Sequence, residues 1–236
     1  MDRLVDRILK FLAIYGILAY IFTVTIILVG SKSFDEKAII LEAGGLILCW
    51  IIVGGLFMRA WRDPLVIAFR SWSIPWGLRF VLLATFLAMR EEVVTTGLSF
   101  LARSLGASSK GIITASTNYF EVIGLNSVVV FIPLFIVWAL MLRWWDFKPA
   151  AVMLLFGLTG TLAETISFGA QNLLMVGFWV FVYGLMVWLP AWTIPRDRGA
   201  GSLRWWHWPL AVLLPFLGNI SVALVVILVR KVLFGG

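Results

Sequence analysis

The chain has 236 residues, of which 62% are hydrophobic and only 13% are charged, and its formal net charge is +7. Ordinary globular domains are about 45–50% apolar and about 25% charged, so this composition excludes a typical soluble domain and favours an integral membrane protein. We attribute the positive charge to loops that meet anionic lipid headgroups rather than to nucleic-acid binding.

A single Cys and a single His exclude an internal disulfide and a Cys-rich metal site, and we predict no metal or other cofactor.

Taken in chain order, the apolar runs predict an all-α, polytopic bundle of transmembrane helices that forms one domain over residues 1–236. A helix needs about 20 mostly apolar residues to cross the hydrocarbon core, and seven segments meet this requirement. An eighth crossing in 64–77 or 111–124 is left open, although the first of these segments is more typical of an interfacial helix and the second of a loop or re-entrant element. The predicted spans are 8–30, 38–58, 78–104, 126–145, 149–168, 171–190 and 207–229.

The distribution of Lys and Arg predicts the orientation of these spans. With seven spans, twelve of the 19 Lys and Arg residues fall in segments on the N-terminal side of the membrane and six on the other side, and Arg90 lies within the third span. By the positive-inside rule the N-terminus is cytoplasmic, although Arg230 and Lys231 argue weakly for the opposite side at the C-terminus. We therefore predict a multi-pass protein of the cell membrane, with the lipid bilayer as its main partner.

Three consecutive charges, Arg90, Glu91 and Glu92, lie in the middle of the third span. An ionisable residue at this depth costs about 2.5–3.5 kcal/mol on insertion scales, so such residues are candidates for function. At helical spacing Glu91 shares a face with Thr95, and Glu92 shares a face with Thr96. We therefore propose Glu91 and Glu92 as site residues, with Arg90 as their counter-charge and the two threonines as cavity-lining residues.

Two further segments contribute polar candidates. In "FGLTGTLAETISFG" the small residues Gly157 and Gly160 share a stripe with Glu164, so that another helix can approach closely beside that carboxylate. In "TASTNYFEVIGLNS" Asn118 and Glu121 are expected at the mouth of a cavity. Glu42 is a weaker candidate, because it lies near enough to the start of its span to reach water.

The stretch "EEVVTTGLSFLARSLG", residues 91–106, resembles the leading motif of the membrane-embedded CAAX prenyl proteases and their bacteriocin-processing relatives, the ABI or CPBP superfamily. That motif is Glu-Glu-x-x-x-Arg, followed by Gly and by an apolar helix that ends in a basic-Leu-Gly turn. The resemblance implies that Glu91 activates a water for peptide hydrolysis and that Glu92 takes the supporting carboxylate position.

The sequence also departs from the family pattern. Thr96 occupies the Arg position, Gly124 stands where the second motif has His, and the third motif, His followed by Asn or Asp, has no counterpart. Without histidine, hydrolysis would lack electrophilic help unless Arg90 supplied it, so an enzyme would be an atypical or degenerate membrane peptidase acting on a membrane-embedded peptide.

Two other interpretations of the same residues remain open. One is a transporter, channel or scaffold subunit whose intramembrane carboxylates handle protons or cations or bind another membrane protein. The other is purely structural, a buried hydrogen-bond network that fixes helix register.

Overall fold

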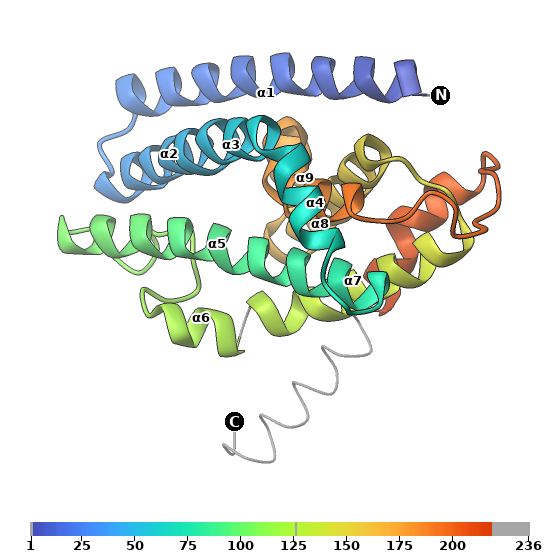
Figure 1. The fold of residues 1–236 in the computed structure, drawn as a ribbon. Coiled ribbons are helices and arrows are strands. Elements are labelled where there is room, and N and C mark those ends of the chain that lie inside the picture. The colour runs from blue at the N-terminus through green and yellow to red at the C-terminus, as the bar shows by residue number, and fades with distance from the viewer. Residues whose placement is uncertain (1, 126, 219–236) are drawn as a thin grey trace.

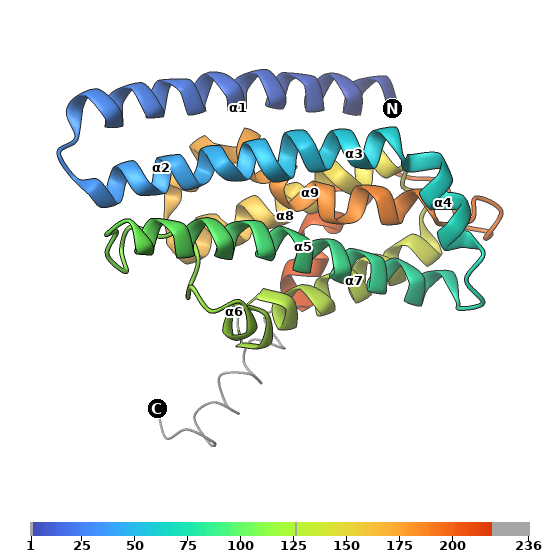
Figure 2. The same ribbon diagram turned by 60° about the vertical axis from the view of Figure 1, so that its left-hand side comes forward.

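The computed structural model describes residues 2–125 and 127–218, and this part of the chain is helical with no strands. The N-terminal half contains α1 (Asp2–Gly30), α2 (Phe34–Leu46), the π-helical turn η1 (Ile47–Gly54), α3 (Gly55–Ala60), α4 (Arg62–Arg70) and α5 (Trp76–Ser104). The remainder contains α6 (Tyr119–Leu125), α7 (Ser127–Trp144), α8 (Pro149–Phe168), the 3-10 turn η2 (Ala170–Met175), α9 (Val176–Trp192) and an apolar helix over His207–Gly218. The predicted all-α bundle is confirmed (Figures 1 and 2).

Five segments are long and apolar enough to cross a membrane, as expected of an integral membrane protein. These segments overlap the predicted spans 8–30, 38–58, 126–145, 149–168 and 171–190, and they extend over Arg3–Gly30, Phe34–Ala60, Tyr119–Trp144, Pro149–Phe168 and Ala170–Trp192.

The other two predicted spans are not among these five segments. The span 78–104 falls within α5, a continuous helix of 29 residues whose centre carries Arg90, Glu91 and Glu92. It therefore matches α1 in length but not in apolar composition. Of the span 207–229, only the part up to Gly218 lies within the described residues, and that part is an apolar helix.

Neither segment considered for an eighth crossing forms one in the described chain. Residues 64–70 belong to α4, which has nine residues and is about 14 Å long at 1.5 Å per residue, too short for a hydrocarbon core of about 30 Å. Residues 111–118 form a loop before α6. Residues 64–70 are thus helical, as the predicted interfacial helix requires.

Local sequence signals explain where several helices begin and end. Ser33 caps α2 by accepting a hydrogen bond from the backbone N–H of Glu36, and Pro149 occupies the first turn of α8, where its missing N–H is not needed. Gly106 and Gly169 adopt φ values of 105° and 106° directly after α5 and α8. Because few other residues tolerate positive φ, these glycines fix the two turns.

The core forms where α8 and α9 pack together at the centre of the bundle, with α5, α7 and α1 around them. A Cβ atom added to Gly157 would lie 2.5 Å from the carbonyl oxygen of Val180, so only glycine allows the two backbones to approach this closely. The small-residue stripe predicted on 157–168 therefore has α9 as its partner helix.

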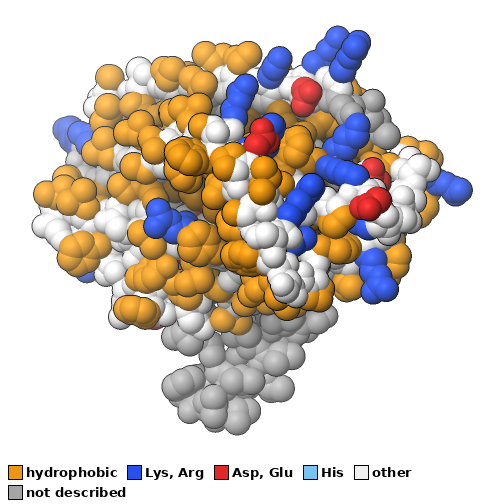
Figure 3. All heavy atoms as spheres, in the orientation of Figure 1, with side chains coloured by type: hydrophobic (Ala, Val, Ile, Leu, Met, Phe, Trp, Pro, Cys, Tyr) orange, Lys and Arg blue, Asp and Glu red, His pale blue; other side chains and the backbone are white. Residues whose placement is uncertain are grey.

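Hydrogen bonds link segments that are distant in the sequence at both ends of the bundle. One end, which we call the basic end, contains Arg70, Arg79, Arg196 and Arg198, and there hydrogen bonds join α4, α7 and the region where α9 ends. Arg70 Nη2 donates to the Trp192 carbonyl (2.9 Å), and Arg198 Nε donates to the Leu142 carbonyl (2.7 Å). At the other end, the Ser108 N–H donates to Asp35 (2.7 Å). Figure 3 shows most Lys and Arg side chains of the visible face near the first end, beside the N-terminus.

Candidate functional site

A partly open cavity of about 1040 Å³ lies between α1, α2, α5, α7, α8 and α9. It extends from Thr114, in the loop before α6, and Gln171, in η2, to Leu46 and Phe156 in the core, and residues 61–75, 145–148 and 193–206 at the basic end do not line it. Its wall is mainly aliphatic and aromatic. Among the described residues that line it there is no Lys, Arg or His, whereas Glu91, Glu92 and Glu164 all line it.

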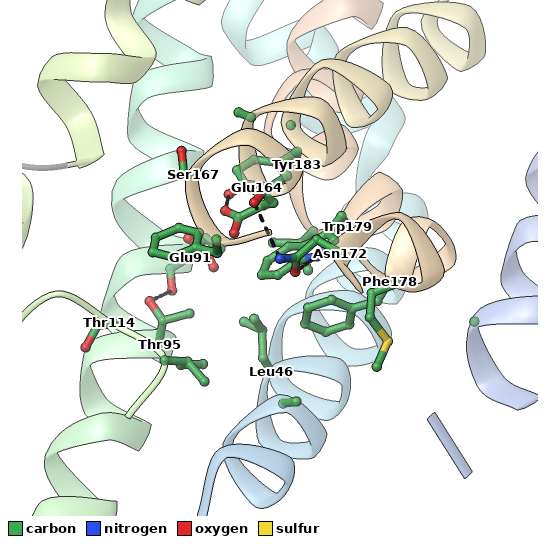
Figure 4. A pocket seen from close by; sticks show the side chains of 18 of the residues that line it. Leu46, Glu91, Thr95, Thr114, Glu164, Ser167, Asn172, Phe178, Trp179 and Tyr183 are labelled. Carbon is green, nitrogen blue, oxygen red and sulfur yellow. Dashed lines mark hydrogen bonds between the residues drawn. The ribbon is translucent and has the colours of Figure 1, made fainter. Parts of the chain in front are cut away.

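Two helices supply the three carboxylates. Glu91 and Glu92 come from the middle of α5, and Glu164 comes from the last turns of α8 (Figure 4). Both glutamates of α5 are buried, with exposed fractions of 5% and 7%, and the three carboxyl groups interact electrostatically with one another. The structure thus brings together three predicted site residues that are up to 73 positions apart in the sequence.

The three carboxylates differ in their hydrogen-bond partners. Glu92 accepts hydrogen bonds from the hydroxyl groups of Thr95 (3.2 Å) and Ser127, and Glu164 accepts one from the hydroxyl of Tyr183. No group in the described part of the chain donates a hydrogen bond to the Glu91 carboxylate. Because adjacent residues of a helix project about 100° apart, Glu92 reaches partners that Glu91 cannot.

The polar groups beside Glu164 are engaged with one another. The Asn172 amide donates to the backbone carbonyls of Glu164 (3.4 Å) and Gly169 (3.2 Å), and its oxygen accepts a hydrogen bond from the Trp179 indole (3.0 Å). Gly160 leaves the space that the Tyr183 ring occupies, which places the tyrosine hydroxyl against Glu164. These donors are therefore already used, whereas the Glu91 carboxylate accepts no hydrogen bond from the described residues.

The remaining predicted site residues lie elsewhere, except for Thr95, which lines the cavity. Thr96 is buried outside the cavity lining, and its hydroxyl has no hydrogen-bond partner among the described residues. Arg90 lies on the exposed face of α5, on the stripe that includes Phe86 and Val93. The expected counter-charge is therefore directed away from the glutamates, because residue 90 falls outside the helix sector that faces the bundle.

Asn118 and Glu121 do not line the cavity either, contrary to our expectation. The Asn118 side chain accepts a hydrogen bond from the backbone N–H of Phe120 (3.1 Å) at the start of α6, the position of a helix cap. Glu121 is exposed and accepts a hydrogen bond from the Ser116 hydroxyl (2.8 Å). Both residues therefore take part in the local structure of the loop that leads into α6.

Glu42 does not reach water as expected. It is 4% exposed, and its Oε2 accepts hydrogen bonds from the Ser99 hydroxyl (2.5 Å) and the Ile113 N–H (3.3 Å). It ties α2 to α5 and to the following loop without lining the cavity.

Sequence reasoning did not identify Tyr183, Asn172 and Trp179 as parts of the site. A usable signal was present, because Tyr183 interrupts the apolar run "FWVFVYGLMVW" and Asn172 lies in "GAQNLLM", at the start of the predicted span 171–190. Polar groups at these positions need buried partners, and the nearest glutamate supplies one.

In the described part of the chain, no group of three or more His, Cys, Asp or Glu side chains is placed to hold a metal ion. Comparison of the chain with protein families, with curated proteins and with solved structures gives no match.

Proposed function

We propose that this protein is a membrane carrier that takes up protons and cations in exchange at Glu91. The observation that carries this proposal is the state of the Glu91 carboxyl group. It is 5% exposed, it accepts no hydrogen bond from the described residues, and it borders a cavity whose described lining has no basic side chain.

The physical basis is the cost of an unpaired charge in an apolar environment. A buried carboxylate without a partner is strongly unfavourable, so it binds either a proton or a cation. Each of these ligands neutralises the group, and each displaces the other. Glu92 and Glu164, held by Thr95 and Tyr183, add negative potential that attracts a cation and repels an anion.

The orientation belongs to the same proposal. We place the protein in the cell membrane with seven spans, α5 and the helix beginning at His207 included, and with the basic end in the cytoplasm. The cavity is lined by residues from the opposite end of the bundle, such as Thr114 in the loop before α6 and Gln171 in η2. It would therefore receive its ligand from the outer side.

Proton–cation exchange can be tested in proteoliposomes that contain a pH-sensitive dye. An acidic interior is imposed, and Na⁺, K⁺ or ethidium is added outside in separate arms. We expect at least one cation to accelerate proton efflux through the wild-type protein and to have no such effect with Glu91→Gln. Glu36→Gln, the same substitution at an exposed residue outside the cavity, is the matched control. Efflux that is equal in wild type and Glu91→Gln in every arm would refute the proposal.

A second candidate is an atypical membrane peptidase. One observation favours it: of the two adjacent glutamates, the first is free in the cavity and the second is held by Thr95 and Ser127. This is the division of roles that the resemblance to CAAX prenyl proteases implies. Two observations oppose it: no cationic side chain is among the described residues that line the cavity, and Tyr183 and Asn172 already donate to other acceptors.

Cleavage of a farnesylated CAAX peptide distinguishes the two candidates. A peptidase would cleave the peptide with the wild-type protein and fail to do so with Glu91→Gln. A carrier predicts no cleavage with either protein, together with proton efflux that depends on Glu91.

A further inference from the structure

The cavity is far larger than a proton or an inorganic ion requires. Its volume of about 1040 Å³ is at the upper end of the range of about 300–1,000 Å³ that is usual for sites of drug-sized ligands. In the part of the chain that the structure describes, no cluster of carboxylates or other ligating side chains could hold a metal ion. The size of the cavity and the spacing of its acids therefore point away from a bare metal cation.

Aromatic side chains form the wall beside the carboxylates. Phe131 of α7 and Trp179 of α9 both lie against the Tyr183 ring, with centroid distances of 5.8 and 5.7 Å. Phe178 extends this wall, with its ring centroid 4.7 Å from that of Trp179. In Figure 4, Glu91 lies on one side of the open space, and Trp179 and Phe178 lie on the opposite side.

Carboxylates and aromatic faces recognise the same kind of ligand. The face of an aromatic ring attracts a cation, by about 2 kcal/mol or more where water is excluded, and an unpartnered carboxylate attracts it more strongly at short range. An organic cation with apolar substituents would satisfy Glu91 with its charge and fill the rest of the cavity with its body. An anion would face three carboxylates, and a neutral apolar molecule would leave Glu91 unpaired.

We infer that the cavity binds a lipophilic organic cation, with its charge next to Glu91 and its apolar groups against Phe131, Trp179 and Phe178. This inference rests on the proposed function and names the class of cation that is exchanged for the proton.

Two ions of nearly equal size and opposite charge test the inference: tetraphenylphosphonium and tetraphenylborate. Their binding to the detergent-solubilised full chain is measured by equilibrium dialysis. We expect the wild-type protein to bind tetraphenylphosphonium at one saturable site and to bind tetraphenylborate at least about tenfold more weakly, since each 1.4 kcal/mol corresponds to a factor of ten. Equal binding of the two ions would mean that the cavity accepts any apolar molecule and would overturn the inference.

Substitutions of glutamate test whether the bound cation lies next to the Glu91 carboxylate. Glu91→Gln is expected to weaken tetraphenylphosphonium binding by about tenfold or more, whereas Glu91→Asp, which keeps the carboxylate, restores most of the affinity. Glu42→Gln removes another buried carboxyl group that does not line the cavity, and it should leave the affinity unchanged. A Glu91→Gln protein that binds tetraphenylphosphonium as well as wild type would refute the inference.

The transport and binding experiments can fail independently of each other. If Na⁺ or K⁺ drives proton efflux that depends on Glu91 while tetraphenylphosphonium does not bind, the carrier proposal stands and the organic cation is wrong. If tetraphenylphosphonium binds at Glu91 but no cation drives proton efflux, the binding site stands and the carrier proposal is wrong.

Discussion

Buried charged residues at the basic end of the bundle have several hydrogen-bond partners, whereas one in the acidic cavity has none among the described residues. At the basic end, guanidinium groups are used as structural donors: Arg198, whose side chain is 4% exposed, bonds the carbonyls of Leu142, Trp145 and Pro195 and the carboxylate of Asp146. In the cavity, Glu91 is just as deeply buried and has no hydrogen-bond partner among the described residues.

Stability and function therefore depend on different buried charges in this molecule. A buried charge that satisfies several backbone groups holds helix ends together, and its removal leaves those groups unpaired. A buried charge without partners contributes nothing to folding and is unfavourable until a ligand arrives. The two regions therefore predict opposite responses to the loss of a charge.

The largest effect is expected at the basic end. Arg198→Ala removes the donor for three carbonyls and the partner of Asp146, and it should lower the free energy of unfolding by about 3 kcal/mol, measured by SDS titration in mixed micelles. Arg196→Ala is the matched control, because Arg196 also contacts Asp146 but its side chain is 42% exposed. Its loss should cost less than about 1 kcal/mol. Equal losses from the two substitutions would break the comparison.

An intermediate effect is expected at the engaged part of the cavity. Tyr183→Phe deletes the hydroxyl that donates to Glu164 and keeps the ring that packs against Gly160. A hydrogen bond to a charged group is worth about 1.5–3 kcal/mol, so the same titration should show a loss of about 2 kcal/mol. An unchanged free energy of unfolding would mean that this hydrogen bond does not hold α8 and α9 in place.

The smallest effects are expected at the adjacent glutamates, and they should have opposite signs. Glu92→Gln weakens the bonds from Thr95 and Ser127 and should cost about 1 kcal/mol. Glu91→Gln replaces a buried carboxyl group that has no hydrogen-bond donor among the described residues by a neutral amide, and it should raise the free energy of unfolding by up to about 1 kcal/mol. If Glu91→Gln destabilised the protein more than Glu92→Gln, Glu91 would be a structural residue.

The general fold followed from the sequence because its causes are local. Apolar runs of about 20 residues predict helices that cross a membrane, and five such segments are present. The predicted span 78–104 is not among these five segments, since Arg90, Glu91 and Glu92 interrupt its helix of 29 residues. The close approach of α8 to another helix was also predictable, because Gly157 and Gly160 lie on one stripe.

The composition of the site was only partly predictable, because it depends on which helix faces which. Glu91 and Glu164 could be proposed from the cost of burying them, but their proximity results from packing between distant segments. The partner of Glu164 was missed for the same reason: Tyr183 and Glu164 meet only because Gly160 makes room for the ring. Arg90 was assigned to the glutamates by sequence adjacency, whereas one step along a helix turns a side chain by about 100°.

Both proposals depend on Glu91 being the free carboxyl group of an apolar cavity. Dicyclohexylcarbodiimide, which modifies carboxyl groups in apolar surroundings, tests this claim when the labelled glutamates are identified by mass spectrometry over time. The account predicts that Glu91 is labelled first, ahead of Glu164 and Glu92, which are hydrogen-bonded, and ahead of Glu42, which lies outside the cavity. Labelling of Glu42 or Glu164 before Glu91, or no labelling of Glu91, would contradict it.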